Sequence, residues 1–303
     1  MADVKIKKIK ALRITTGYDC DCKCSYCTQL NSDISHRFNG SGSQLQSLCV
    51  ILKNRQILSD NVLIEIEGGE PLLHIDMIKQ IVTLCDQLSD YNIHVSYIIV
   101  SNCHKLNTKE GRELITWMKN HGCKFVVSAS FDHDQKNPRY LTDDTYTFLR
   151  NLGLYSVNCT YVVKGKEFIN RAKQNIDFLN DKGFAVSILW NFFAYDELAD
   201  ESTREQYQRL VLSTKNNSDK QRFSGSPDYC RWVGISPNGR LYGCNEANFG
   251  IADLEKGKKM SEEKCNKCDL KEYCKQCIVR KSLYGDSLCH HVRANYRFWE
   301  GGV

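Results

Sequence analysis

Short segments rich in β-branched residues alternate with helical patterns along the first two thirds of the chain. The predicted strands cover residues 11–15, 62–67, 95–101, 125–131, 157–163 and 185–189. The predicted helices cover residues 44–58, 75–88, 109–120, 143–152, 168–182 and 201–215. Because this alternation is typical of a parallel sheet built from strand–helix repeats, we predict an α/β fold. Six repeats favour a partial (β/α)6 TIM-like barrel over the closed barrel of eight.

The amino-acid composition of the chain changes after residues 213–228, STKNNSDKQRFSGSPD. This polar stretch has the Gly, Pro and Ser content of a linker. The last 74 residues hold seven cysteines and few long apolar runs. A segment with so little apolar sequence needs bound metal to order it. We therefore predict a barrel over residues 1–215 and a small Cys-rich C-terminal domain ordered by metal over residues 216–303, which the resemblance described below makes an iron-sulfur domain.

Cysteine is unusually frequent, with 16 in 303 residues. The N-terminus has no apolar stretch of signal-peptide length, and no run approaches the roughly 18 apolar residues of a membrane span. We expect a cytoplasmic protein without a membrane partner, in which clustered cysteines bind metal rather than form disulfides. Metal-bound thiolates would offset most of the formal charge of +5, so we expect no nucleic-acid partner.

Four cysteines crowd the segment CDCKCSYC, residues 20–27, directly after the first predicted strand. Loops that follow parallel strands are the usual location of active sites. Cys20, Cys24 and Cys27 have the spacing CxxxCxxC, which offers three thiolates to one four-iron cluster and leaves one iron free for a small chelating molecule. A zinc site and a chance spacing are the alternatives. Cys22 lies outside the spacing and is interpreted as a spare thiol.

Two neighbouring features favour an iron–sulfur cluster over a zinc site or a chance spacing. Tyr26 is an aromatic residue directly before Cys27, and the second predicted strand ends in EGGEP, residues 67–71. Together with CxxxCxxC, this combination resembles the radical S-adenosylmethionine enzymes. Gly68 and Gly69 allow close backbone approach, and Glu70 can accept a hydrogen bond from an ammonium group, which in the family belongs to the methionine part of S-adenosylmethionine. An ordinary turn that starts a helix at Pro71 is the alternative.

Weaker matches follow the next two strands. SNC, residues 101–103, stands where the family often has Thr-Asn-Gly, and SFD, residues 130–132, resembles its Ser-Leu-Asp. The resemblance makes Ser130 a candidate for a ribose contact and Arg139 a candidate near the carboxylate, with a structural strand-end role as the alternative for each. The cofactor-binding candidates are thus Tyr26, Gly68, Gly69, Glu70, Pro71, Ser130 and Arg139.

A second array of cysteines lies near the C-terminus, at Cys230, Cys244, Cys265, Cys268, Cys274, Cys277 and Cys289. Its central CxxCx5CxxC could be a zinc knuckle. The whole order, with Gly239 five residues before Cys244, resembles the SPASM extension of radical S-adenosylmethionine enzymes. The resemblance implies two auxiliary clusters, an outer one on Cys265, Cys268, Cys274 and Cys289 and an inner one on Cys230, Cys244 and Cys277.

The array departs from the family in two ways. Cys274 and Cys277 are separated by two residues rather than three, and no fourth cysteine for the inner cluster lies just upstream. Either a group such as Asp228 completes that cluster, or its open iron binds a substrate thiolate. The resemblance thus implies three 4Fe-4S clusters in all, with S-adenosyl-L-methionine bound at the first.

The implied activity is that of a maturase that abstracts hydrogen through a 5′-deoxyadenosyl radical and oxidatively forms a thioether or carbon–carbon cross-link in a ribosomally made peptide. Its expected partners are a precursor peptide and an electron donor such as flavodoxin or ferredoxin. Because the first predicted strand begins near Ala11, leader binding would fall to a separate protein or to the barrel edge. A sulfatase-maturing activity is disfavoured, since Asn245 follows Cys244 where those relatives place an aspartate.

Other functions remain open. A peptide epimerase would need a thiol that returns hydrogen, for which Cys103 and Cys159 are candidates, although a packing role is the simpler interpretation of both. A radical dehydrogenase of a small molecule is a further possibility. The non-enzymatic alternative is a metal-ordered binding or electron-transfer module, which explains the C-terminal array but not the pairing of CxxxCxxC with GGEP.

Overall fold

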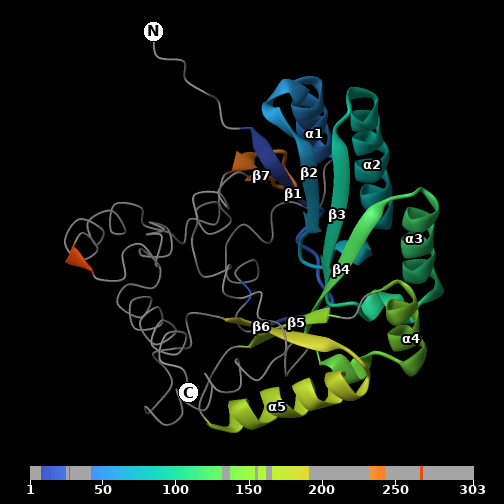
Figure 1. The fold of residues 1–303 in the computed structure, drawn as a ribbon, viewed down its shortest axis with the longest axis vertical. Helices are drawn as coiled ribbons and strands as arrows, with labels where there is room; N and C mark the ends of the chain where they lie inside the picture. Colours follow the sequence, from blue (N-terminus) through green and yellow to red (C-terminus); the bar gives the residue numbers. More distant parts are fainter. Residues whose placement is uncertain are drawn as a thin grey trace. The chain divides into compact units, whose positions relative to one another are not determined.

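The computed structural model describes residues 8–24, 27, 42–131, 137–153, 156–161, 166–190, 232–242 and 267–268 (Figure 1). The chain divides into two compact units. The first contains strands β1 (Ile9–Thr15), β2 (Leu58–Glu67), β3 (His94–Ser101), β4 (Lys124–Phe131), β7 (Trp232–Ile235) and β8 (Leu241–Tyr242), with helices α1 (Ser43–Lys53), α2 (Ile75–Asp86), α3 (Lys109–Asn120) and α4 (Asp143–Asn151). The second contains β5 (Ser156–Tyr161), α5 (Lys166–Asp181) and β6 (Ala185–Trp190).

The sheet of the first unit has the strand order β4-β3-β2-β1-β7-β8. Strands β1 to β4 are parallel in sequence order, with Thr15 opposite Glu67 and Ile66 opposite Ile99. Strand β7 pairs in parallel with β1, and the short β8 runs antiparallel to β7. This parallel α/β arrangement confirms the predicted fold class. It also brings the carboxyl ends of β1, β2 and β3 to one edge of the sheet.

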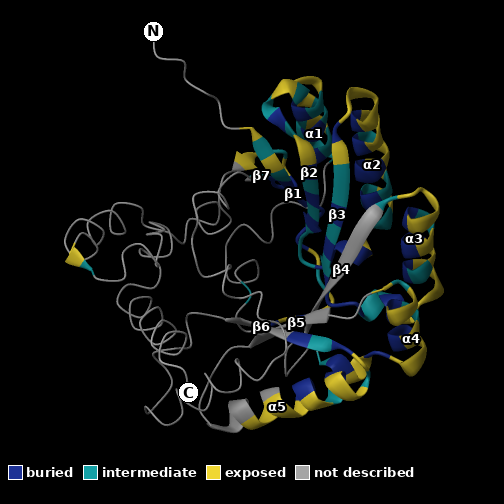
Figure 2. Ribbon diagram, viewed as in Figure 1, coloured by how far each residue is buried: buried dark blue, intermediate teal, exposed yellow. Residues whose placement is uncertain are grey.

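Alternate residues of the central strands form the core of the first unit. Leu12 and Ile14 of β1 and Ile64 and Ile66 of β2 are completely buried, as are Leu48 of α1 and several residues of α2 (Figure 2). The residues between them are partly exposed and include the ion pair of Arg13 with Glu65, at 2.9 Å between Nη2 and Oε2. One face of the sheet is therefore apolar, and the other accepts charged side chains.

Local signals explain most helix boundaries. Thr108 caps α3 by accepting a hydrogen bond from the Gly111 N–H, and Thr142 caps α4 in the same way through the Thr145 N–H. The helix predicted over residues 44–58 ends at Lys53, followed by a short 3-10 turn, and β2 begins at Leu58 rather than at residue 62. Leu58 is buried and lies opposite Ile9 of β1, so pairing extends the strand beyond its alternating pattern.

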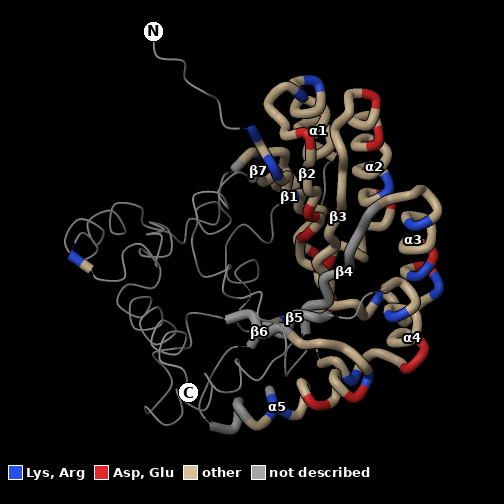
Figure 3. Tube along the Cα trace, viewed as in Figure 1, with Lys and Arg blue, Asp and Glu red and all other residues tan. Residues whose placement is uncertain are grey.

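The second unit repeats the strand–helix–strand pattern. Strands β5 and β6 pair in parallel, with Val157 opposite Val186, and α5 connects them. In the described part of the chain, residues of both charge signs are interspersed along helices α2 to α5 (Figure 3), and no described helix is both long and apolar enough to cross a membrane. The predicted helix at residues 201–215 and the predicted domain boundary after residue 215 lie outside the described residues.

Candidate active site

The segments after β1 and β2 lie side by side at the carboxyl edge of the sheet. The Thr16 N–H donates to the Glu67 carbonyl at 2.8 Å, and the Gly69 N–H donates to the Gly17 carbonyl at 2.9 Å. A third bond of 2.8 Å joins the Glu70 N–H to the Asp19 carbonyl. These bonds hold the start of the cysteine loop, which we define as residues 16–27, directly against the GGEP turn.

The two glycines of the GGEP turn make this approach possible. A Cβ atom on Gly69 would lie 2.3 Å from the Asp19 carbonyl oxygen and 2.5 Å from that of Tyr18. A Cβ atom on Gly68 would lie 2.5 Å from the Gly17 carbonyl oxygen. These distances are far below normal van der Waals contact, so any other residue would push the cysteine loop away. The sequence predicted that Gly68 and Gly69 allow the backbone to lie close to a ligand. In the structure they allow it to lie close to the backbone of the cysteine loop.

Glu70 is the third residue of the GGEP turn and is buried, with 1% of its surface exposed. Its Oε1 accepts hydrogen bonds from the Leu72 N–H at 2.9 Å and the Ser101 hydroxyl at 2.7 Å, and its Oε2 accepts one from the Asn102 N–H at 2.8 Å. Burial raises the pKa of Glu70 to about 7, although these three donors act in the opposite direction. Glu70 therefore ties the end of β2 to the end of β3.

The cysteines of the loop differ in their surroundings. Cys22 and Cys24 are buried, whereas Cys20 and Cys27 are partly exposed. The Cys27 N–H donates to the Cys24 carbonyl at 3.0 Å, and the Cys22 N–H donates to the Cys20 sulfur at 3.3 Å. Hydrogen bonds of the Cys22 thiol with Cys20 and Cys24, together with burial, raise the pKa of Cys22. Among the described residues, the ligand atoms of Cys20, Asp21 and Cys22 lie within 4.8 Å of one another, and Cys24 and Cys27 do not belong to that group. Thiolates are the ligands that an iron–sulfur cluster requires.

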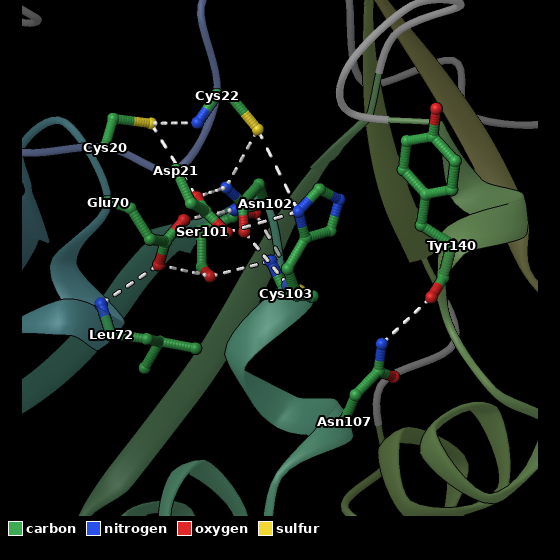
Figure 4. A network of polar contacts seen from close by, with 11 residues as sticks. Cys20, Asp21, Cys22, Glu70, Leu72, Ser101, Asn102, Cys103, Asn107 and Tyr140 are labelled. Carbon is green, nitrogen blue, oxygen red and sulfur yellow. Dashed lines mark hydrogen bonds and ion pairs between the residues drawn. The ribbon is translucent and has the colours of Figure 1, made fainter.

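Asn102, which follows β3, connects the cysteine loop to Glu70 of the GGEP turn and to His104 (Figure 4). Its Nδ2 donates to Asp21 Oδ1 at 2.6 Å and to Cys22 Sγ at 3.3 Å, while its Oδ1 accepts a bond of 2.9 Å from the His104 N–H. The His104 ring in turn places Nδ1 at 3.3 Å from Asp21 Oδ2. Asp21, Asn102 and His104 were not predicted as site residues; the only signal for them was the position of SNC after the third strand.

Cys103 occupies the position where the resemblance places a glycine. Its φ of 66° lies in the left-handed region that glycine adopts without strain. The side chain is completely buried, and the backbone N–H donates to the Ser101 hydroxyl at 2.8 Å. The third residue of this turn is therefore in a conformation that glycine adopts easily, although it is cysteine.

The remaining predicted residues are placed as follows. Pro71 is buried at the start of a short 3-10 helix, Pro71–Leu73, and Arg139 is exposed in another, Pro138–Tyr140. Ser130 lies in β4, Cys159 lies in β5, and Cys268 is partly exposed. Outside the described residues are Tyr26, Asp228, Cys230, Cys244, Asn245, Cys265, Cys274, Cys277 and Cys289. The two predicted auxiliary ligand sets therefore stay predictions.

No protein-family model matches the chain. Among curated proteins it is similar to a 3-deoxy-manno-octulosonate cytidylyltransferase of Blochmanniella floridana, at 22% identity over 166 residues. That match covers 49% of this chain and 56% of the relative, so the chain spans about half the length of the curated relative it matches.

The likeness to solved structures extends over almost the whole chain. Native anSMEcpe with bound AdoMet (S-adenosylmethionine) superposes with a TM-score of 0.63 at 13% identity, covering 95% of this chain and 96% of its own. The same protein with AdoMet and the Kp18Cys peptide gives 0.64 at 13% identity over the same shares. A histidine-tagged form of anSMEcpe with AdoMet gives 0.64 at 14%, covering 96% and 93%. The chain therefore has the fold of anSMEcpe, a protein solved with bound AdoMet and also with AdoMet and a peptide.

Proposed function

We propose that this protein is a radical S-adenosylmethionine enzyme that oxidatively modifies a ribosomally made peptide, forming a thioether or carbon–carbon cross-link. The observation that supports it best is the cysteine loop, fixed against the GGEP turn at the carboxyl ends of β1 and β2 by the bonds from Gly69 and Glu70. The fold is shared with a protein solved with AdoMet and, in two structures, with a peptide.

In this proposal Cys20, Cys24 and Cys27 hold the first 4Fe-4S cluster. When bound, that cluster and S-adenosylmethionine supply one-electron chemistry that yields a 5′-deoxyadenosyl radical able to abstract hydrogen from carbon. Gly68 and Gly69 keep the cysteine loop in place, because no side chain fits between the two segments. Glu70 has three bonds already, so its main part is to fix the shape of the turn, and an ammonium group can use only the remaining lone pair of Oε2.

The peptide substrate class is supported by the anSMEcpe structures that contain the Kp18Cys and Cp18Cys peptides. We propose a cross-link rather than sulfatase maturation because Asn245 stands where an aspartate is expected for the latter. Two auxiliary clusters on the C-terminal cysteines would accept the electron that an oxidative product releases. A flavodoxin or ferredoxin would act as reductant, and the leader peptide would bind a separate protein or the barrel edge.

The experiment is anaerobic reconstitution followed by incubation with precursor peptides. About 12 irons per chain and release of 5′-deoxyadenosine are expected, together with a peptide lighter by two hydrogens. Bound zinc without cleavage of S-adenosylmethionine would instead indicate a metal-ordered binding module.

The peptide mass also separates the enzymatic alternatives. Unchanged mass with uptake of solvent deuterium would indicate epimerisation, and a product from a small molecule alone would indicate dehydrogenation. Cys103→Gly is a matched variant for the epimerase hypothesis, because glycine fits the φ of 66° while the thiol is removed. A cross-linking enzyme should keep its product in this variant, whereas an epimerase that uses Cys103 should lose it.

A further inference from the structure

Four potential metal ligands meet where the cysteine loop faces the turn after β3. The ligand atoms of Cys20, Asp21 and Cys22 all lie within 4.8 Å of one another. His104 approaches the same group, with Nδ1 at 3.3 Å from Asp21 Oδ2 and 3.9 Å from Cys22 Sγ. Of these four residues, only Cys20 belongs to the set predicted to hold the first iron–sulfur cluster.

The spacing of these atoms suits a small tetrahedral ion. With metal–sulfur bonds of about 2.3 Å and metal–nitrogen or metal–oxygen bonds of about 2.0–2.1 Å, the ligand atoms of a tetrahedral zinc site lie about 3.3–3.8 Å apart. The distances of 3.3 and 3.9 Å from His104 Nδ1 are close to this range. Two thiolates, an imidazole and a carboxylate are ligands that zinc accepts, whereas calcium and magnesium prefer oxygen alone.

The surrounding hydrogen bonds orient these ligands. Asn102 Nδ2 donates to Asp21 Oδ1 at 2.6 Å, which leaves Oδ2 directed to His104, and donates to Cys22 Sγ at 3.3 Å (Figure 4). Asn102 is itself held by Glu70, through a bond of 2.8 Å from its N–H. The ring of His104 packs edge-on against Tyr140, with centroids 5.7 Å apart. Outer hydrogen bonds of this kind orient metal ligands and increase affinity.

We propose that Cys20, Asp21, Cys22 and His104 form a site for one divalent ion of the zinc type. Binding releases the two thiol protons and places a 2+ ion among two thiolates and a carboxylate, which compensates most of their negative charge. Because the site shares Cys20 with the predicted cluster, the two metal centres exclude each other. Cys22 and His104 serve only the divalent ion, and Cys24 and Cys27 serve only the cluster. The proposal does not rest on the proposed enzymatic function.

The test is a Co²⁺ titration of the full chain, prepared anaerobically without clusters and monitored by the thiolate-to-cobalt and d–d absorption bands. Any cobalt bound by the C-terminal cysteines contributes the same background in every variant, because none of the substitutions lies in that array. We expect Cys22→Ala and His104→Gln each to bind one equivalent less than the wild type. Cys24→Ala and Cys49→Ala, a thiol in α1, should bind as many equivalents as the wild type.

The opposite pattern overturns the proposal: unchanged stoichiometry in Cys22→Ala and His104→Gln, or loss of an equivalent in Cys24→Ala. His104→Gln replaces a partly exposed side chain by one of similar size, so this variant should fold. Its cobalt stoichiometry therefore tests the proposed site even if circular dichroism shows that Cys22→Ala is unfolded. A second measurement tests exclusion. One equivalent of Zn²⁺ added before reconstitution should lower the iron content of the wild type by about four, and that of His104→Gln much less.

The measurements separate the divalent-ion site from the enzymatic function. If no cluster forms at Cys20, Cys24 and Cys27 under any condition, the proposed enzymatic function fails while the cobalt result stands. If clusters form and S-adenosylmethionine is cleaved but cobalt shows no dependence on Cys22 or His104, only the divalent site fails.

Discussion

At the scale of single residues, Glu70 shows how burial and hydrogen bonding oppose each other in one carboxyl group. Three donors favour the charged form, but almost complete burial has the larger effect and raises the pKa to about 7. The folded protein therefore binds more protons than the unfolded chain between about pH 4.5 and 7. By linkage, this group makes the folded state less stable as pH rises through that window, and the loss is complete above it.

Replacement of Glu70 by Gln should remove this pH dependence. We expect the free energy of unfolding of the wild type to fall by about 1–3 kcal/mol relative to the variant between pH 4.5 and 7.5, since one pKa unit corresponds to about 1.4 kcal/mol. Urea unfolding at several pH values measures the difference. Parallel curves for the two proteins would show that the Glu70 pKa is not raised.

Gly69 tests the close approach of the cysteine loop. Because a Cβ atom would lie 2.3 Å from the Asp19 carbonyl oxygen, Gly69→Ala should destabilise the fold by about 3 kcal/mol and reduce the iron bound at the first site. Gly153→Ala is the matched control: its φ of +82° is unfavourable for alanine, but nothing lies within 4 Å, so a cost of about 1 kcal/mol is expected. Equal losses in denaturant unfolding would argue against a steric role for Gly69.

At the scale of elements, Asn107 joins the 3-10 helix after β3, His104–Asn107, to the start of α4. Its Nδ2 donates to the Tyr140 carbonyl at 2.9 Å, and its Oδ1 accepts from the Thr142 N–H at 3.2 Å and the Thr145 hydroxyl at 2.8 Å. Asn107→Ala should cost about 1–2 kcal/mol of stability, because several partners lose a bond at once. Asn54→Ala removes only one exposed bond to Val50 and should cost less than about 0.5 kcal/mol. Thermal unfolding of both variants provides the comparison, and a ranking in the reverse order would contradict it.

The elements also show where sequence reasoning succeeds. The strands β1 to β6 and helices α1 to α5 are long enough for their periodicity to be visible, and all were predicted, with shifted ends where pairing extended a strand, as at Leu58. Strands β7 and β8 have only four and two residues, too few for a periodic signal. Their pairing depends on β1, which is distant in sequence, and on Ser47 of α1, whose hydroxyl bonds to the Gly239 carbonyl.

The candidate site likewise contains residues that local sequence patterns predicted and residues that depend on contacts with distant parts of the chain. The spacing of Cys20, Cys24 and Cys27 and the GGEP turn are local patterns, and the structure places both segments at the carboxyl edge of the sheet. The Asp21–Asn102–His104 network has no local pattern, because it forms only when the register of β2 and β3 brings three strand ends together. Cys22 was interpreted as spare for the same reason: its contacts with Asn102 and His104 come from another part of the chain.

At the scale of the whole molecule, the prediction that remains is that the three proposed iron–sulfur clusters form independently of one another. The first cluster is proposed to depend on the cysteine loop of the first unit, whereas Cys268 belongs to the outer auxiliary set predicted from the C-terminal array. If three clusters form separately, the loss of one ligand should remove about four irons and leave the other two clusters intact. Anaerobically reconstituted Cys24→Ala and Cys268→Ala should therefore each contain about 8 irons against about 12 in the wild type.

Cleavage of S-adenosylmethionine then distinguishes these two variants, because it requires the first cluster alone. Cys24→Ala should release no 5′-deoxyadenosine, while Cys268→Ala should still release it without forming the peptide product. Cys22→Ala is the control within the cysteine loop and should keep about 12 irons, since its thiol is not in the predicted cluster set. Loss of the first cluster in Cys22→Ala with its retention in Cys24→Ala would assign the iron to a different set of thiols, and the loop would then have to bind its cluster through Cys22.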